Sequence, residues 1–488
     1  MNRPLRRVGV ACLLLFGLLL LQVNWIQVVK AKDYRNDPRN RRVLLREYDR
    51  ERGPIVVGTG SQRVAVAKSV KTSDALKYLR TYPGDPRVYA PVLGFASFVY
   101  GYTGIERQEN SVLSGDDERL LVRRLSDYIT GRQIKGGTVE LTINPKAQTA
   151  AFQGLAGKRG AVVALDPRTG AVLAEASSPS YDPNPISSHD GRSIRAAYQA
   201  LLRAAEDPLS NRGVQDTYPP GSTFKVITTA AALAHGYTPQ TRIPSPTVLD
   251  LPGTTANLKN FGGETCGDGK SDTLLNSLEI SCNTAFGALG MKLGQDVVRK
   301  QAEAFGFGDS GLDLPQPVAT SEFPTGLTKA QTAQSSIGQY DVRVTPLQMA
   351  MVAAGIGNNG DIMRPYLVNR TLAPDLSELS KADPQVYKHA VSSSVAAAVT
   401  SMMVAVVEKG TGTNAQIPGV TVAGKTGTAQ HGPGAAPHAW FIGFAPAVHP
   451  VVAVAVLVED GGSLGSDATG GKVAAPIAKA VMEAVLGK

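Results

Sequence analysis

Ser222 and Lys225 are the residues whose types and spacing are best suited to chemistry in this chain. They lie in the run 217–225 (TYPPGSTFK), which leads directly into an apolar, alanine-rich segment, 226–233. If a helix begins at Ser222, this spacing places both side chains on one face, one turn apart, where the lysine amine is a base for the serine hydroxyl. The helix N-terminus would also stabilise an oxyanion. A helix-capping serine beside a solvated lysine has the same pattern, so this run alone does not distinguish a catalytic serine from a structural one.

Two further motifs follow Ser222 in order along the chain. Ser281 and Asn283 form a Ser-x-Asn early in a predicted helix, and residues 425–428 (KTGT) follow a short predicted strand and open another element. The order Ser-x-x-Lys, Ser-x-Asn and Lys-Thr-Gly is the three-part signature of the penicillin-recognising serine acyltransferases. Each motif alone is common, but Ser222 begins the only Ser-x-x-Lys of the chain. The set therefore favours nucleophilic catalysis by Ser222.

Acyl transfer has a use for each side chain in these motifs. Lys225 must lose its proton to act as a base, and burial near a second cation, Lys425, would lower its pKa in that direction. Ser281 has a hydroxyl that can relay a proton to a leaving amine. Asn283 has both a donor and an acceptor for a peptide backbone.

The Lys-Thr-Gly motif suits a substrate that ends in a carboxylate. The amine of Lys425 and the hydroxyls of Thr426 and Thr428 provide charge and donors, and Gly427 lets a substrate backbone approach the strand closely. The alternative reading of the second and third motifs is a helix-cap serine, a turn asparagine and an exposed strand end. His438 is interpreted as a structural strand residue.

Local patterns predict the elements that must position the motifs. Residues 160–177 read as a hairpin, and strand signals return at 420–423, 439–444 and 451–458. Helical patterns lie between them and after them, at 192–206, 223–234, 276–293, 295–305, 345–355, 392–407 and 472–486. Strands at both ends of the segment 160–488 predict one sheet that is completed by both termini of the domain.

The N-terminal segment has the pattern of a membrane anchor. Arg3, Arg6 and Arg7 precede an apolar stretch, residues 8–29, which spans roughly 33 Å as a helix. The arginines predict that residues 1–7 are cytoplasmic and that the chain beyond residue 30 is extracytoplasmic. A cleaved signal peptide is the alternative.

Composition excludes some function classes. The net charge of +9 comes from basic residues that are dispersed among acids, which indicates a solvated surface and no nucleic-acid partner. Cys266 and Cys282 lie in the exported part, where disulfides persist, and we predict a bridge between them; two free thiols are the alternative. No Cys or His cluster has metal-site spacing, so no metal and no other cofactor is predicted.

The sequence resembles the class B penicillin-binding proteins, and within them the PbpA-type monofunctional D,D-transpeptidases. The likeness covers most of the chain. Besides the three motifs, it rests on the segments 52–55, 142–145, 160–179, 218–225, 337–339, 345–347, 364–365, 424–430 and 438–446. It implies an α+β fold: one N-terminal transmembrane helix, a strand-rich pedestal domain, and a transpeptidase domain whose antiparallel sheet packs against helices.

The resemblance also implies the reaction. Ser222 would form an acyl-enzyme from the D-Ala-D-Ala end of a peptidoglycan stem peptide, an amine on a second strand of lipid-linked or nascent glycan would resolve it, and β-lactams would acylate the same serine. By the same likeness, the backbone N–H groups of Ser222 and Thr428 form the oxyanion hole. A further implied partner is a polytopic glycan polymerase of the shape, elongation, division and sporulation (SEDS) type. Asn24 and Gln27 lie on one face of the membrane helix and are the predicted contact face for such a partner; interfacial solvation is the alternative.

Other classes share parts of this pattern. A serine β-lactamase of the kind that deacylates through a glutamate four residues before an asparagine is disfavoured, because no glutamate between Asn283 and Lys425 has that partner. A D,D-carboxypeptidase uses the same residues and remains an alternative, as does a β-lactam-binding assembly scaffold. The predicted domains are a cytoplasmic N-terminus (1–7), a transmembrane helix (8–29), an extracytoplasmic pedestal (30–158) and a transpeptidase domain (159–488).

Overall fold

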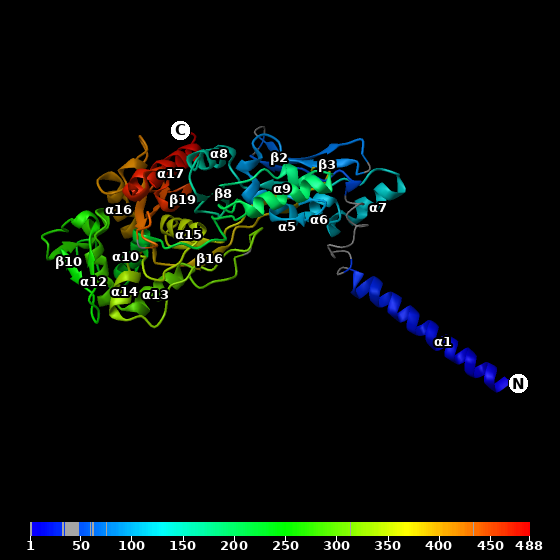
Figure 1. Cartoon of the computed structure of the whole chain (residues 1–488), viewed down its shortest axis with the longest axis horizontal. Coiled ribbons are helices and arrows are strands. Elements are labelled where there is room, and N and C mark those ends of the chain that lie inside the picture. Colours follow the sequence, from blue (N-terminus) through cyan, green and yellow to red (C-terminus); the bar gives the residue numbers. More distant parts are fainter. Residues whose placement is uncertain are drawn as a thin grey trace.

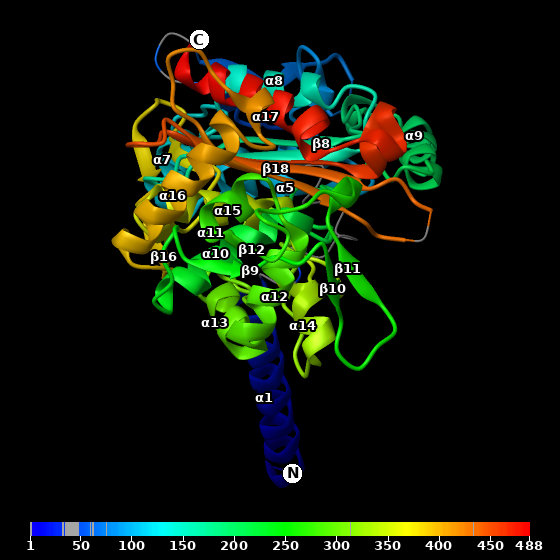
Figure 2. The ribbon, with the colours of Figure 1, turned by 90° about the vertical axis from the view of Figure 1, so that its left-hand side faces the viewer.

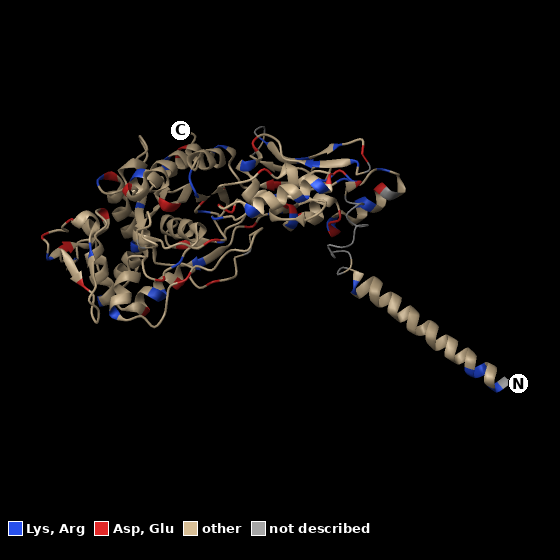
Figure 3. Cartoon of the chain, in the orientation of Figure 1, with Lys and Arg blue, Asp and Glu red and all other residues tan. Residues whose placement is uncertain are grey.

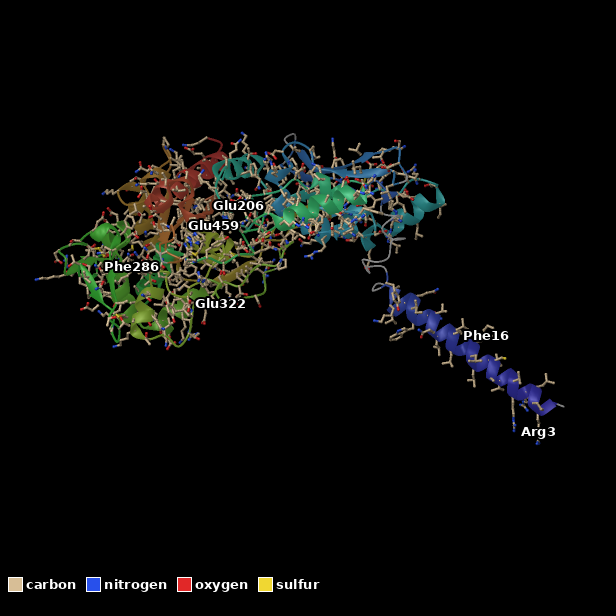
Figure 4. The ribbon with its side chains drawn as sticks, in the orientation of Figure 1. Arg3, Phe16, Glu206, Phe286, Glu322 and Glu459 are labelled. Carbon is tan, nitrogen blue, oxygen red and sulfur yellow. A yellow bond between two sulfur atoms is a disulfide. The ribbon has the colours of Figure 1, made fainter. Side chains whose placement is uncertain are left out.

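A long apolar helix stands apart from the rest of the chain (Figure 1). In this computed structural model, α1 (Asn2–Asn24) continues into the π-helical turn η1 (Trp25–Val29). The span Arg3–Val29 has a mean hydropathy of 2.1, and it is the one helix among the described residues that is long and apolar enough to cross a membrane. Its apolar side chains, such as Phe16, point away from the helix axis and are exposed (Figure 4).

The structure describes residues 2–31, 34, 48–58, 60, 63–74, 76–312, 314–432 and 434–488. Most of the predicted start of the pedestal, residues 32–47 apart from Tyr34, therefore lies outside the described residues.

The pedestal is built on a six-stranded sheet. Its strands lie in the order β15-β14-β6-β1-β2-β3, and all neighbours are antiparallel except β1 and β6. The strands are β1 (Ile55–Val57), β2 (Val64–Lys71), β3 (Tyr78–Thr81), β6 (Thr138–Leu141), β14 (Val368–Leu372) and β15 (Glu378–Lys381). Two of the six thus come from a segment far along the chain, where Val368 pairs with Leu141.

Short helices and a small hairpin complete the pedestal. They are α4 (Ala90–Leu93), β4 (Ala96–Ser97), β5 (Gly101–Tyr102), α5 (Gly104–Gln108), α6 (Asn110–Ser114) and α7 (Leu121–Ile129). Glu106 on α5 is fully buried and pairs with Arg52 and Arg80, at 2.7 Å and 2.6 Å. This buried ion cluster joins α5 to the edge of the sheet.

The second part of the chain is built around a five-stranded antiparallel sheet. Its order is β17-β18-β19-β7-β8. These strands are β7 (Gly160–Leu165), β8 (Val172–Ser178), β17 (Ala423–Ala429), β18 (His438–Ala445) and β19 (Val452–Val458). The prediction of one sheet completed by both ends of the segment 160–488 is confirmed.

Helices cover both faces of this sheet. Figure 2 shows α8 (Pro145–Gly154) and α17 (Gly470–Leu486) on one side of β18 and α15 (Pro346–Gly357) on the other. Successive side chains of β19 point to opposite faces of the sheet. Val454 and Val456 pack with α8 and α17, whereas Ala455 and Leu457 pack with α15. The sheet is therefore buried on both faces.

A mainly helical region lies beyond α15 (Figure 2). Its helices are α10 (Lys225–Ala234), α11 (Leu274–Glu279), α12 (Asn283–Leu293), α13 (Gln295–Ala304), α14 (Lys329–Ser335) and α16 (Ser393–Glu408). Its short strands are β9 (Arg242–Pro244), β10 (Val248–Asp250), β11 (Asn257–Lys259), β12 (Ser271–Thr273), β13 (Asp361–Met363) and β16 (Val386–His389). Helix α9 (Gly191–Arg203) instead packs against the pedestal, where Tyr198 contacts Phe95 and Tyr100.

Two local predictions are wrong. The helix predicted over 276–293 is broken between α11 and α12, where Ser281 has a left-handed backbone with φ of +65°. The strand predicted over 420–423 begins only at Ala423 and runs on to Ala429, so the Lys-Thr-Gly motif lies inside this one strand. In both places, contacts with distant segments decide the local conformation.

Candidate active site

Ser222 lies at the start of a helix, in the 3₁₀ turn η6 (Gly221–Phe224) that continues as α10. Trp440 holds the preceding backbone in place by donating from Nε1 to the Pro219 carbonyl at 3.0 Å. Gly221 has φ of +53°, and its N–H donates to the Gly338 carbonyl at 2.9 Å. A side chain here would press on the backbone of Thr428 and Ala429, so glycine is required where the turn meets β17.

Lys225 is fully buried one turn beyond Ser222. Its Nζ donates to the Ser281 carbonyl at 2.6 Å and to Asn283 Oδ1 at 2.8 Å, and it lies 3.3 Å from Ser281 Oγ. The amine also lies over the ring of Phe286, which Figure 4 labels, at 5.6 Å from the ring centre. Burial first, and the nearby Lys425 second, hold the pKa of Lys225 well below its ordinary value.

Ser281 lies at the break between α11 and α12, between two amines. Its Oγ accepts from Lys425 Nζ at 2.9 Å and lies 3.3 Å from Lys225 Nζ. The disulfide between Cys266 and Cys282 joins this break to the preceding loop, with Cα atoms 6.2 Å apart. Ser281 is thus placed to pass a proton from one amine to a group bound beside the other.

Lys425 is a fully buried residue of β17, the edge strand of the five-stranded sheet. Its Nζ also donates to the Thr426 carbonyl at 3.0 Å, and burial lowers the pKa of Lys425 to about 7. A Cβ on Gly427 would lie 3.0 Å from the Pro220 carbonyl, so glycine lets β17 pack against the turn that carries Ser222. The hydroxyl of Thr426 bonds to Thr411, while Thr428 is half-buried.

The electrostatics of this cluster are unusual, because two lysines are buried close together. No carboxylate among the described residues forms an ion pair with Lys225 or Lys425. Both amines are instead held by carbonyl and hydroxyl oxygens, and both pKa values are lowered. A site of this kind favours a neutral amine, which is the form that can accept a proton.

The structure brings most of the sequence-predicted residues together, and it leaves one predicted contact unmade. Lys225, Ser281, Asn283 and Lys425 form one hydrogen-bonded group. Among the described residues, however, the half-buried hydroxyl of Ser222 has no hydrogen-bond partner, so it is not bonded to Lys225 here. Catalytic hydrogen bonds are often long in unliganded sites.

Comparison with known proteins identifies the family. A model of the penicillin-binding protein transpeptidase domain matches residues 160–483, and one of the penicillin-binding protein A dimerisation domain matches residues 52–139. Peptidoglycan D,D-transpeptidase PbpA of Mycolicibacterium smegmatis is 49% identical over 100% of this chain and 99% of its own length.

This chain belongs to the penicillin-binding protein transpeptidase family.

A solved structure supports the same assignment. Penicillin-binding protein A from M. tuberculosis, in a ceftriaxone acyl-enzyme complex, matches with a TM-score of 0.87 and 47% identity, over 91% of this chain and 100% of the other. The family resemblance and the α+β fold class predicted from the sequence are confirmed.

Sequence reasoning missed two positioning residues of this penicillin-binding protein. Asn260 accepts hydrogen bonds from the N–H groups of Asn283 and Thr284, at 2.9 Å and 3.0 Å, and so caps α12 from a distant loop. Glu459, labelled in Figure 4, is buried and accepts from Tyr218 at 3.0 Å and from Arg212 at 2.9 Å. No local pattern in the sequence marks either residue, because their partners are remote.

His438 lies in β18 outside this cluster. Burial, more than any charge, lowers the pKa of His438 to about 4 and keeps the ring neutral. His431, His438 and Asp460 are the one trio of potential metal ligands that lie together among the described residues. Their potential ligand atoms lie within 4.8 Å of one another. His438 Nδ1 accepts from the Asp460 N–H at 3.2 Å, and the two histidine rings stack in parallel at 3.9 Å.

Proposed function

We propose that this chain is a peptidoglycan D,D-transpeptidase that cross-links stem peptides in cell-wall synthesis, with Ser222 as its nucleophile. The observation that carries the proposal is the convergence of two buried amines on one hydroxyl, with Ser281 Oγ 3.3 Å from Lys225 Nζ and 2.9 Å from Lys425 Nζ, beside the helix start that holds Ser222. The name of the M. smegmatis relative, peptidoglycan D,D-transpeptidase PbpA, states the same activity.

The substrate would bind along β17 as an added strand. An edge strand has unpaired N–H and C=O groups on one side, which a peptide can use for hydrogen bonds. The terminal carboxylate of D-Ala-D-Ala would meet the amine of Lys425 and the hydroxyls of Thr426 and Thr428. The side-chain amide of Asn283 would hold the peptide backbone from the opposite side. These four residues would orient the substrate, with Gly427 allowing the close approach.

Acylation would begin with proton transfer from Ser222 Oγ to the neutral amine of Lys225. The oxygen attacks the carbonyl carbon of the penultimate D-alanine, and the N–H groups of Ser222 and Thr428 stabilise the oxyanion. When the tetrahedral intermediate collapses, the peptide C–N bond breaks and a proton passes from Lys225 through Ser281 to the leaving nitrogen. The products are an ester on Ser222 and free D-alanine.

The second half-reaction would reverse these roles. An amine of another stem peptide attacks the ester carbonyl and gives a proton to Lys225. The C–O bond to Ser222 then breaks, Lys225 returns the proton to Ser222 Oγ, and the cross-linked peptide is released. A β-lactam follows the first half-reaction only in part, because its leaving nitrogen stays tethered to the acyl group.

Covalent labelling tests the site assignment. A fluorescent penicillin is expected to label the full chain at Ser222, and Ser222→Ala is expected to remove the label. Ser126→Ala, on the exposed face of the pedestal, is the matched control and should label fully. Labelling that survives Ser222→Ala would reject Ser222 as the nucleophile.

Product analysis tests the reaction. With a D-Ala-D-Ala substrate and an acceptor amine, we expect a cross-linked product in addition to released D-alanine. Hydrolysis alone, with and without the amine, would assign the chain to the D,D-carboxypeptidases. Penicillin labelling without turnover of either kind would favour a β-lactam-binding scaffold.

We further propose the arrangement of the chain at the membrane. Residues 1–7 are cytoplasmic, residues 8–29 cross the bilayer, and the pedestal (30–158) and transpeptidase domain (159–488) are extracytoplasmic; the basic N-terminus and the apolar span support this. Asn24 and Gln27 would contact a polytopic glycan polymerase of the SEDS type, although Asn24 here donates to Leu20 of its own helix at 2.8 Å. A mature N-terminus that begins just after residue 31 would reject the anchor.

A further inference from the structure

The pedestal helix α7 carries its apolar side chains on the outside. Leu121, Val122, Leu125 and Ile129 are 51%, 81%, 57% and 86% exposed. At helical spacing, these four positions lie within roughly 100° of arc, so they form one continuous stripe. A single exposed apolar residue is normal on a protein surface. A continuous apolar stripe along a whole helix instead indicates a surface that binds something.

The charged side chains of the same helix face the protein. Asp127 and Arg124 are only 15% and 24% exposed as side chains. Arg124 pairs with Asp116 at 3.2 Å, and Arg123 pairs with Asp375 in the turn between β14 and β15. The usual amphipathic pattern is therefore inverted, because ion pairs hold α7 to the pedestal while its apolar stripe points outward.

A neighbouring turn extends the apolar stripe. Leu376, next to Asp375 in the turn between β14 and β15, is 62% exposed. Arg119, in the turn just before α7, donates to the Leu379 carbonyl of β15 at 3.2 Å and so links the start of α7 to this strand. The patch therefore consists of the four residues of α7 and Leu376, which lie far apart in the sequence and meet at the end of the pedestal sheet.

The basic residues beside the patch are paired with acids. Arg119 pairs with Asp117, Arg124 with Asp116 and Lys135 with Glu51. Figure 1 shows α7 at the end of the pedestal that lies away from the transpeptidase part, and Figure 3 shows both basic and acidic residues there. Arg50, near the start of the described pedestal, shares Asp116 with Arg124 of α7, so the chain enters the pedestal beside this helix. A helix with an exposed apolar face at this point of an anchored chain has the features of one that lies in a membrane interface.

We propose that α7 seats the pedestal on the bilayer that α1 crosses. The apolar patch enters the boundary between head groups and acyl chains. The proposal rests on the membrane anchoring proposed above and is independent of the reaction at Ser222. Its consequence is a fixed height of the active site above the membrane, because the pedestal would be held at two points, α1 and α7.

Lipid-borne quenching tests the contact in the full chain. The variant Cys12→Ala leaves only the Cys266–Cys282 disulfide, so a single cysteine can be introduced at Val122 and labelled with an environment-sensitive fluorophore. In nanodiscs that contain phosphatidylglycerol and nitroxide-labelled lipids, we expect quenching several-fold stronger for Val122→Cys than for Val448→Cys. Val448 is the matched control, since it is a valine with 72% exposure in the loop between β18 and β19.

The outcomes separate the possible occupants of the patch. Equal quenching at positions 122 and 448 would overturn the proposal. Disulfide-linked dimers through position 122, without quenching by lipid, would assign the patch to a second copy, and protection only after addition of a glycan polymerase would assign it to that protein. Penicillin labelling of the wild-type chain tests the proposed function separately, and labelling of each variant to the wild-type level verifies that the variant is folded.

Discussion

Buried charge is handled in opposite ways in the two parts of this molecule. In the pedestal, Glu106 is fully buried between Arg52 and Arg80 and also accepts from Tyr82 at 3.1 Å. In the transpeptidase part, Lys225 and Lys425 are equally buried, and their polar contacts are to carbonyl, amide and hydroxyl oxygens.

The pKa shifts follow from this difference. Burial alone raises the pKa of Glu106, but Arg80 and Arg52 outweigh it and hold that pKa below its ordinary value, so the carboxylate stays ionised. Burial lowers the pKa of both lysines, and no opposite charge counteracts it. A paired buried charge serves stability, whereas an unpaired one keeps a group reactive at a cost in stability.

Lys225→Met gives the largest expected effect on activity. Loss of a general base lowers a rate by about a hundredfold to ten-thousandfold, and we expect penicillin acylation to fall within this range. Stability should change little, because Met avoids the cost of burying a polar amine, which offsets the loss of its hydrogen bonds to Ser281 and Asn283. Stopped-flow acylation and urea unfolding measure the two quantities. Acylation within tenfold of wild type would remove Lys225 from the mechanism.

Glu106→Gln is expected to have the opposite profile. It leaves two buried guanidinium groups without a full negative charge, which lowers the free energy of unfolding by about 3–5 kcal/mol. The acylation rate of the folded fraction should stay at the wild-type value, since the site is elsewhere. Glu118→Gln, at an exposed position of the pedestal, is the control and should leave both quantities unchanged. A loss as small as the control's would show that the cluster does not stabilise the pedestal.

The pH profile of acylation sharpens the contrast at the active site. The rate is expected to rise with pH as Lys225 loses its proton, because only the neutral amine accepts the proton of Ser222. Lys425 is the second cause of the low pKa of Lys225, so Lys425→Met should raise that pKa and move the rising limb to higher pH. Exposed Lys409→Met serves as the control and should leave the limb in place. A limb that stays in place in Lys425→Met would mean that burial alone sets the pKa.

Sequence patterns predicted what short-range order determines. The helix start at Ser222 and the hairpin of β7 and β8 follow from local periodicity and turn residues. The sheet completed by both ends of its segment was predicted from the strand signals that lie at those two ends. The join of β14 to β6 could not be predicted, because pairing between Val368 and Leu141 is decided by the packed structure. The left-handed Ser281 was missed for the same reason, since a non-glycine residue with positive φ is held there by contacts from other segments.

Asn260→Ala is the smallest effect we expect, and it tests how the break at Ser281 is held. Asn260 Oδ1 accepts from two N–H groups at the start of α12, so its loss costs about 1 kcal/mol, as for other helix caps. Because the same bonds position Asn283 against Lys225, the acylation rate should also fall, by about fivefold if the whole of that energy is lost in the transition state. Urea unfolding and acylation kinetics give both values. If stability falls without any change in acylation, the disulfide at Cys282 suffices to position the motif, and Asn260 is only a cap.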